Sequence, residues 1–216
     1  TDMDVDRVSH VVRFAATIGQ RDTLVTTRSI FSAMPPDHHP AEGRTIDIEL
    51  IGSERKDHEE AYWTEQNENL ERLFARKIKE RIEQREVRQL SVFALAPQPL
   101  LIRLGTLLGD IVPVSVHQKH REPETWKWLP DQPRIAYKVK EYSGRKDVPV
   151  ALKLALSATV NDERITSVLG EDAAIWSITC DQPGNDIMRR RDDLGAYKRL
   201  VRDLFDRIKA YHGEGV

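Results

Sequence analysis

The amino-acid sequence predicts an α/β fold in which helices cover both faces of a layered sheet, preceded by a short helical segment. Apolar runs of strand length alternate along the chain with longer segments whose apolar residues recur at helical spacing. Proline and glycine mark many of the transitions between these segments. Because strands that alternate with helices are typical of a parallel layered sheet, we expect a Rossmann-like architecture.

The first 44 residues are expected to form an upstream or connecting segment ahead of the main domain, residues 45–216. Residues 5–19 place valine and alanine at helical spacing and end at Gly19, which predicts a helix. A second short helix is expected at about residues 23–33. The proline-rich stretch that follows, residues 35–40, interrupts the helical pattern, so we place the candidate boundary there.

The middle of the chain is expected to contribute three strands and two helices. Alternation of Ile46, Ile48 and Leu50 with polar residues predicts the first strand. The charged residues of the long helix that follows are expected to form a solvated face. The remaining elements lie in or next to the most informative stretch, residues 91–129. The expected ranges after the first strand are a helix at 59–86, a strand at 90–95, a helix at 98–109 and a strand at 112–118.

The last third of the chain predicts three more strands and a closing amphipathic helix. Residues 164–169 between them fit either a short helix or a turn. The final helix ends at Gly213, and the alternating pattern would call for another strand directly after it. The end of the chain therefore looks like a cut within a larger architecture. The strands are expected at 135–143, 148–160 and 173–181.

Composition limits the classes of partner. The 216 residues include 33 Lys and Arg against 35 Asp and Glu, a net charge of -2, which does not favour bulk binding to duplex nucleic acid or an anionic membrane. The single cysteine, Cys180, excludes an intrachain disulfide and is expected to be a small buried residue. With no secretion signal and no apolar stretch of membrane-spanning length, we expect a cytoplasmic protein.

The first candidate binding feature is the turn between the 90–95 strand and the following helix. Ala96, Pro97 and Gln98 lie in this turn, at the carboxyl end of a buried strand. Open α/β sheets bind their ligands at this end, and helix N-termini there suit phosphate groups. No standard nucleotide fingerprint is present, and the prolines fit equally well as simple helix initiators.

The second candidate is the basic, aromatic loop after the 112–118 strand. Lysine and arginine bind phosphate, and indole rings offer stacking surfaces to bases. The alternative is that one or both tryptophans cap the core. The candidate residues in this loop are Gln118, Lys119, His120, Arg121, Trp126 and Trp128.

A third candidate pair, Ser157 and Thr159, follows the 148–156 part of a strand. Their hydroxyl groups suit contacts to ribose or phosphate, and they fit equally well as ordinary turn residues. No catalytic motif accompanies these candidates, and we expect neither catalytic residues nor a metal site. His117 and His120 lie three residues apart without further ligands at metal spacing.

An ordered series of segments resembles the SAVED domain, the cyclic-oligonucleotide sensor of bacterial anti-phage (CBASS) effectors, over about residues 45–216. The matching segments are SVFALAPQPLLIRLGTLLGDIVPVSVHQKHREPETWKWL, VALKLALSATV, IWSITCDQPGNDIMRRRDDLGAY and RLVRDLFDRIKAYHGEG. The resemblance implies two CARF-like, Rossmann-like halves in tandem, of which this chain looks like the first. It also implies a cyclic di-, tri- or tetranucleotide ligand, no cofactor, and a fused or partner effector such as a nuclease, TIR NADase or protease.

In such a sensor, Lys119 and Arg121 would bind phosphates, Trp126 or Trp128 would stack on a base, and the turn from Ala96 to Gln98 would approach the ligand backbone. Ser157 and Thr159 would contact ribose or phosphate. The family often oligomerises on binding its ligand. Two other functions stay open: a ring nuclease that cleaves the cyclic messenger, and a scaffold whose tryptophans anchor a protein partner.

Overall fold

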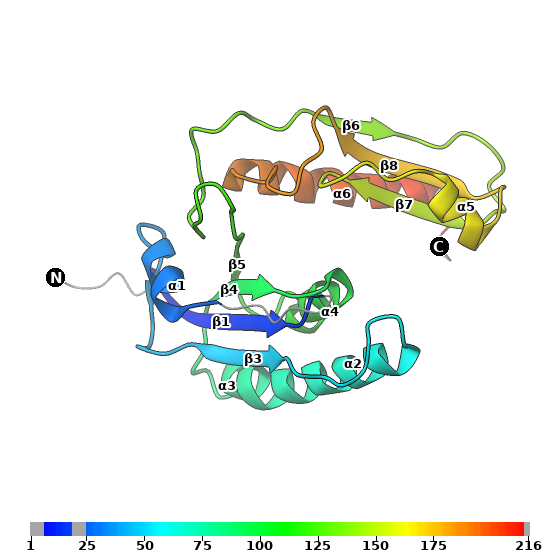
Figure 1. Ribbon diagram of the computed structural model, residues 1–216. Helices are drawn as coiled ribbons and strands as arrows, with labels where there is room; N and C mark the ends of the chain where they lie inside the picture. The colour runs from blue at the N-terminus through cyan, green and yellow to red at the C-terminus, as the bar shows by residue number, and fades with distance from the viewer. Residues whose placement is uncertain (1–6, 19–24, 214–216) are drawn as a thin grey trace. The chain divides into compact units, whose positions relative to one another are not determined.

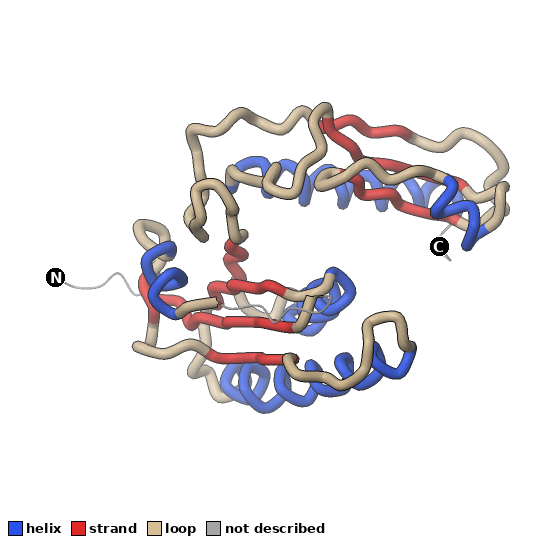
Figure 2. The backbone as a smooth tube through the Cα atoms, in the orientation of Figure 1, coloured by secondary structure: helices blue, strands red, loops and turns tan. Residues whose placement is uncertain are grey.

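The computed structural model describes residues 7–18 and 25–213, which form two compact units, residues 1–127 and residues 128–216 (Figures 1 and 2). Each unit has its own sheet and its own helices. The Rossmann-like α/β class is confirmed, with a parallel sheet flanked by helices in the first unit. The strands expected in one layered sheet are divided between two sheets.

The first sheet is built around β1 (Val8–Ala16), which has parallel neighbours on both edges. On one edge β2 (His39–Pro40) and then β3 (Ile46–Leu50) pair with it, and on the other edge β4 (Leu90–Leu95) does so. Beyond β4 lies β5 (Val114–His117), again parallel. The arrows of β1, β3 and β4 accordingly point the same way in Figure 1.

The helix expected at residues 5–19 is wrong, because most of this segment is β1. Val11 and Val12 point to opposite faces of the sheet, and both are buried. A strand buried on both faces is apolar without alternation, so its valines and alanines also satisfy helical spacing. Pairing with β3 and β4 favours the extended form, and β-branched valine suits it. Gly19, the expected stop, lies outside the described residues.

Helices cover both faces of the first sheet, as predicted. One face packs against α2 (Glu60–Phe74), a π-helical turn η2 (Ala75–Lys79), α3 (Glu80–Glu83) and α4 (Gln98–Leu108). The other face packs against α1 (Thr27–Ala33) and the indole of Trp126.

The long helix expected at 59–86 is present from Glu60 to Glu83 and contains η2 in its second half. Leu70, Phe74 and Ile78 form its buried stripe, at the spacing that the sequence shows.

The second sheet has three strands in the order β6, β8, β7. Its parallel pair is β7 (Val150–Ala155) with β8 (Ala174–Cys180), connected through α5 (Glu163–Leu169), while β6 (Tyr137–Lys140) runs antiparallel to β8. Residues 164–169 are therefore helical rather than a turn. The closing helix, α6 (Arg191–His212), packs Leu204 and Ile208 against Trp176 and Ile178 of β8.

The contacts place β1 in the same unit as β3 and β4, and the division between the two units falls after residue 127. The family boundary expected near residue 45 stays a prediction, because this division does not test it.

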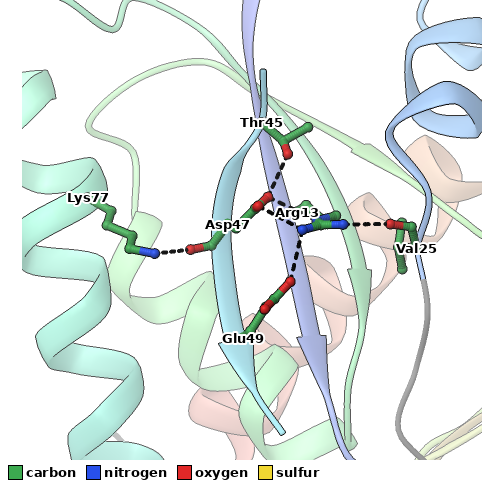
Figure 3. Close-up of polar contacts among 6 residues, drawn as sticks. All are labelled: Arg13, Val25, Thr45, Asp47, Glu49 and Lys77. Atoms are coloured by element: carbon green, nitrogen blue, oxygen red, sulfur yellow. Dashed lines mark hydrogen bonds and ion pairs between the residues drawn. The ribbon is translucent and has the colours of Figure 1, made fainter. Parts of the chain in front are cut away.

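A polar network crosses the first sheet on the face covered by α1 (Figure 3). Arg13 of β1 lies directly opposite Asp47 of β3 and donates to both of its carboxylate oxygens, at 2.9 and 2.7 Å. The same guanidinium donates to Glu49 at 2.9 Å and to the carbonyl of Val25, just before α1, at 2.9 Å. The hydrogen bond with Asp47 raises the pKa of Arg13. From η2, Lys77 donates to the backbone carbonyl of Asp47 at 2.6 Å.

We expect the Arg13→Leu substitution to lower the free energy of unfolding by about 1–2 kcal/mol, because Asp47 and Glu49 would lose their shared cation and Val25 its donor. Urea denaturation followed by circular dichroism measures the change. Arg44→Leu is the matched control, since Arg44 pairs with Glu42 through a side chain that is 83% exposed and should change stability by less than about 0.5 kcal/mol. Equal effects of the two substitutions would contradict the structural role of the Arg13 network.

Candidate functional site

The parallel strands of the first unit bring two of the predicted binding loops to one edge. Phe93 of β4 is paired with His117 of β5, so the segments that follow these strands are neighbours. Those segments are Ala96–Gln98 and Gln118–Arg121, the turn and the basic loop selected from the sequence. The carboxyl edge of the sheet is where ligands of open α/β sheets bind.

The turn before α4 offers less to a phosphate than the sequence indicated. Leu100 and Leu101 both donate their backbone N–H to the carbonyl of Pro97, at 3.0 and 3.2 Å, and Pro99 has no N–H. Among the described residues this leaves Gln98, which is exposed, as the first-turn residue of α4 whose backbone N–H is not bonded to the carbonyl of Pro97. Ala96 is buried and Pro97 half-buried. The turn therefore presents one backbone donor and one amide side chain.

The basic loop is closed on itself. His120 and Thr125 exchange backbone hydrogen bonds of 2.7 and 3.4 Å across its base. Lys119 donates to Glu124 at 2.7 Å, and this hydrogen bond holds the pKa of the Glu124 carboxyl below its ordinary value. The charge of Lys119 is thus largely compensated within the loop. Arg121 is exposed near the tip of the loop, and Gln118 is half-buried at its start.

Two residues of the basic loop that were proposed as ligand contacts are buried, as is Ala96 in the turn. The indole of Trp126 is 1% exposed and packs edge-on against Phe93, with ring centroids 5.3 Å apart. Lys119 Nζ lies 5.9 Å from the same indole. The imidazole of His120 is also buried. An indole enclosed in this way presents no face to a base, so we assign Trp126 to the core, which was the alternative that the sequence left open.

The two tryptophans belong to different units. Trp128 is half-buried and packs against the core of the second unit. Ser157 and Thr159 follow β7 in that second unit, and both are exposed. The predicted residues therefore fall into two groups, with Trp128, Ser157 and Thr159 in the second unit and the other eight in the first.

The carboxyl edge of the second sheet carries a pocket that the sequence analysis missed. Here the backbone N–H of Gly184 donates to the carbonyl of Leu156 at 3.0 Å, which joins the loop after β8 to the end of β7. The pocket has a volume of about 480 Å³. Its lining comes from the segment that enters β6, the end of β8 and the loop after it: Gln132, Pro133, Arg134, Ile135, Ala136, Cys180, Asp181, Gln182, Gly184, Asp186, Ile187 and Arg189.

One sequence signal could have found this pocket. The segment Asp181-Gln182-Pro183-Gly184 directly follows a buried strand and has the turn residues of a ligand-binding loop. The other half of the lining, residues 132–136, is brought there only by the antiparallel pairing of Tyr137 with Cys180. Cys180 is buried as expected, with its thiol directed at the carbonyl of Leu156 at 3.7 Å.

Most charges around the pocket are paired. Arg189 donates to the carbonyl of Asp186 at 2.9 Å, to its carboxylate at 3.0 Å and to the side-chain oxygen of Gln132 at 3.2 Å. Asp181 forms an ion pair with Lys138 of β6. Burial, with the nearby charge of Asp193 in second place, raises the pKa of Tyr137 above its ordinary value, so this phenol stays protonated and donates to the carbonyl of Asp193 at 2.9 Å.

The described residues contain no group of three His, Cys, Asp or Glu side chains arranged to hold a metal ion. In the same ranges, no helix has the length and apolar character needed to cross a membrane. The fold places loops at the carboxyl edge of each sheet, which is where α/β proteins that bind small molecules carry their sites.

Residues 70–216, more than half of the chain, match a family model described as "SAVED: SMODS-associated and fused to various effectors sensor domain". The chain therefore belongs to the SAVED family of sensor domains, in agreement with the resemblance seen in its sequence. A search of curated proteins found no match.

We expect Trp126→Ala to lower the free energy of unfolding by about 3–5 kcal/mol, because a large buried ring would leave a cavity between Phe93 and α1. Thermal and urea denaturation measure the loss. Trp128→Ala provides the matched control and should cost less, because Trp128 is only half-buried. If Trp126→Ala left stability unchanged, the indole would not be a core residue and its role as a stacking surface would be restored.

Proposed function

We propose that this chain is the sensing part of an effector-linked anti-phage defence protein and that it binds a cyclic di-, tri- or tetranucleotide. Membership in a family of sensor domains fused to effectors is the observation that carries the proposal. The catalytic step would belong to a fused or associated effector, and ligand binding would switch that effector on. No cofactor is required for this role.

Each unit, taken by itself, presents polar groups at the carboxyl edge of its sheet that suit a nucleotide ligand. At the first edge Arg121 is exposed in the basic loop that Gln118 begins, and Gln98 adds an amide and a backbone donor. A guanidinium donates two parallel hydrogen bonds to a phosphate, so it favours an anionic ligand over a neutral one. At the second edge Ser157 and Thr159 are exposed next to the loop that lines the pocket. Trp126 no longer belongs to the proposed contacts.

A panel of cyclic di-, tri- and tetranucleotides, screened by thermal unfolding, tests the sensor function. A ligand present at about one hundred times its Kd stabilises the folded state by about 2.7 kcal/mol, which corresponds to an increase in Tm of roughly 5–10 °C for a chain of this size. The proposal predicts such an increase for at least one member of the panel. If no member raised the Tm, binding of a cyclic oligonucleotide by this chain would be refuted.

Arg121→Gln should weaken binding of the stabilising cyclic nucleotide roughly tenfold, because one charge-assisted contact to phosphate is lost. Isothermal titration measures the change. Arg76→Gln is the matched control, since Arg76 is exposed on η2, on the other side of the sheet from α1. Equal Kd values for the wild type and Arg121→Gln would remove the basic loop from the site. Linear products appearing during the titration would instead show a ring nuclease.

A further inference from the structure

We propose that the pocket at the carboxyl end of β8 is a subsite for a single nucleotide, with the uncharged base inside the pocket and one phosphate at Arg134 on its rim. This inference rests on the proposed function, since the nucleotide would be one unit of the cyclic messenger. The inference goes beyond the proposed function by assigning the base and the phosphate of that nucleotide to separate residues of the second unit.

The inner surface of the pocket suits a flat, partly apolar ring. Ile135, Ile187 and Cys180 line it and belong to the hydrophobic core of the second unit, and Pro133 and Ala136 extend this apolar surface outward. A volume of about 480 Å³ lies in the lower half of the range for small-molecule sites, about 300–1,000 Å³. The pocket therefore suits one nucleotide rather than a whole cyclic oligonucleotide.

The charges inside the pocket argue against a phosphate there. The guanidinium of Arg189 is held by Asp186 and Gln132 through three hydrogen bonds, and Asp181 is paired with Lys138. A phosphate placed among these groups would have to displace Asp186 from Arg189 and lie beside its carboxylate. Leaving a carboxylate without its cation in a partly enclosed site is unfavourable, so an uncharged base is the better occupant.

The rim, in contrast, offers one cation and one amide that no group of the described chain engages. Arg134 is exposed and has no ion pair or hydrogen bond with any described residue, and the same holds for the side-chain amide of Gln182. An amide pairs with the donor and acceptor edge of a purine such as adenine. A guanidinium near the mouth suits the phosphate that remains outside when the base is inside.

Binding of adenosine 5′-monophosphate, adenosine and inorganic phosphate to the full chain tests the subsite, with NMR titration as the readout because single nucleotides bind weakly. The proposal predicts that adenosine perturbs the residues of the pocket, that the monophosphate binds roughly five- to tenfold more tightly, and that inorganic phosphate alone does not bind there. Perturbation by inorganic phosphate but not by adenosine would overturn it.

Two substitutions separate the base from the phosphate. Arg134→Gln should lower the affinity for the monophosphate to that for adenosine and leave the affinity for adenosine unchanged. Arg202→Gln on α6 is the matched control, because Arg202 is exposed and unpaired among the described residues. Gly184→Leu should abolish binding of both, since Gly184 lines the pocket and a Cβ added there meets no atom within 4 Å, so the fold has room for the new side chain at the expense of the ligand. Unaltered adenosine binding in Gly184→Leu would overturn the proposal.

The cyclic-nucleotide panel distinguishes failure of the subsite from failure of the sensor function. If a cyclic oligonucleotide stabilises the wild type and Gly184→Leu equally, the subsite is refuted and the sensor function stands. If no cyclic oligonucleotide binds, the sensor function is refuted, and the titrations with adenosine and its monophosphate still decide whether the pocket binds a nucleotide. Circular dichroism of each variant confirms that the fold is retained.

Discussion

The structure of the first unit depends on β1, a strand that is hydrogen-bonded along both edges and buried on both faces. Because β3 and β4 both run parallel to it, the loops that follow these strands leave the sheet at the same edge. Arg13, in the middle of β1, donates hydrogen bonds both to Asp47 of β3 and to the carbonyl of Val25, just before α1. A half-buried guanidinium in a sheet is favourable when its donors are satisfied, and Asp47, Glu49 and Val25 accept hydrogen bonds from it.

In both units, parallel pairing of neighbouring strands brings the loops that follow them together at one edge of the sheet, but the side chains at the two edges differ. Parallel pairing of β4 with β5 places the Pro97 turn beside the basic loop, and parallel pairing of β7 with β8 places Ser157 beside the Gly184 loop. The first edge presents an exposed arginine and amides, which suit the charged part of a ligand. The second edge presents a pocket whose inner charges are already paired, which suits an uncharged ring.

Much of the candidate site could be predicted from the sequence because it depends on where strands end. A buried strand followed by a turn is visible in the residues from Leu90 to Gln98, and the basic loop after His117 is equally local. The role of Trp126 could not be predicted in the same way. A tryptophan in a loop rich in charge has the same local signature whether its ring faces solvent or fills a gap above Phe93, and only the packing of α1 on the sheet decides between these positions.

By itself, the sequence determined the α/β class, most helices and strands after residue 44, and the resemblance to a sensor family, because these depend on local periodicity and on ordered motifs. The tertiary structure alone decided three other features. It made residues 8–16 a central strand, since its apolar pattern fits both a helix and a doubly buried strand until its neighbours are present. It divided the strands between two sheets. It also formed the pocket at β8, because residues 132–136 reach this edge only through pairing between β6 and β8, in which Tyr137 lies opposite Cys180.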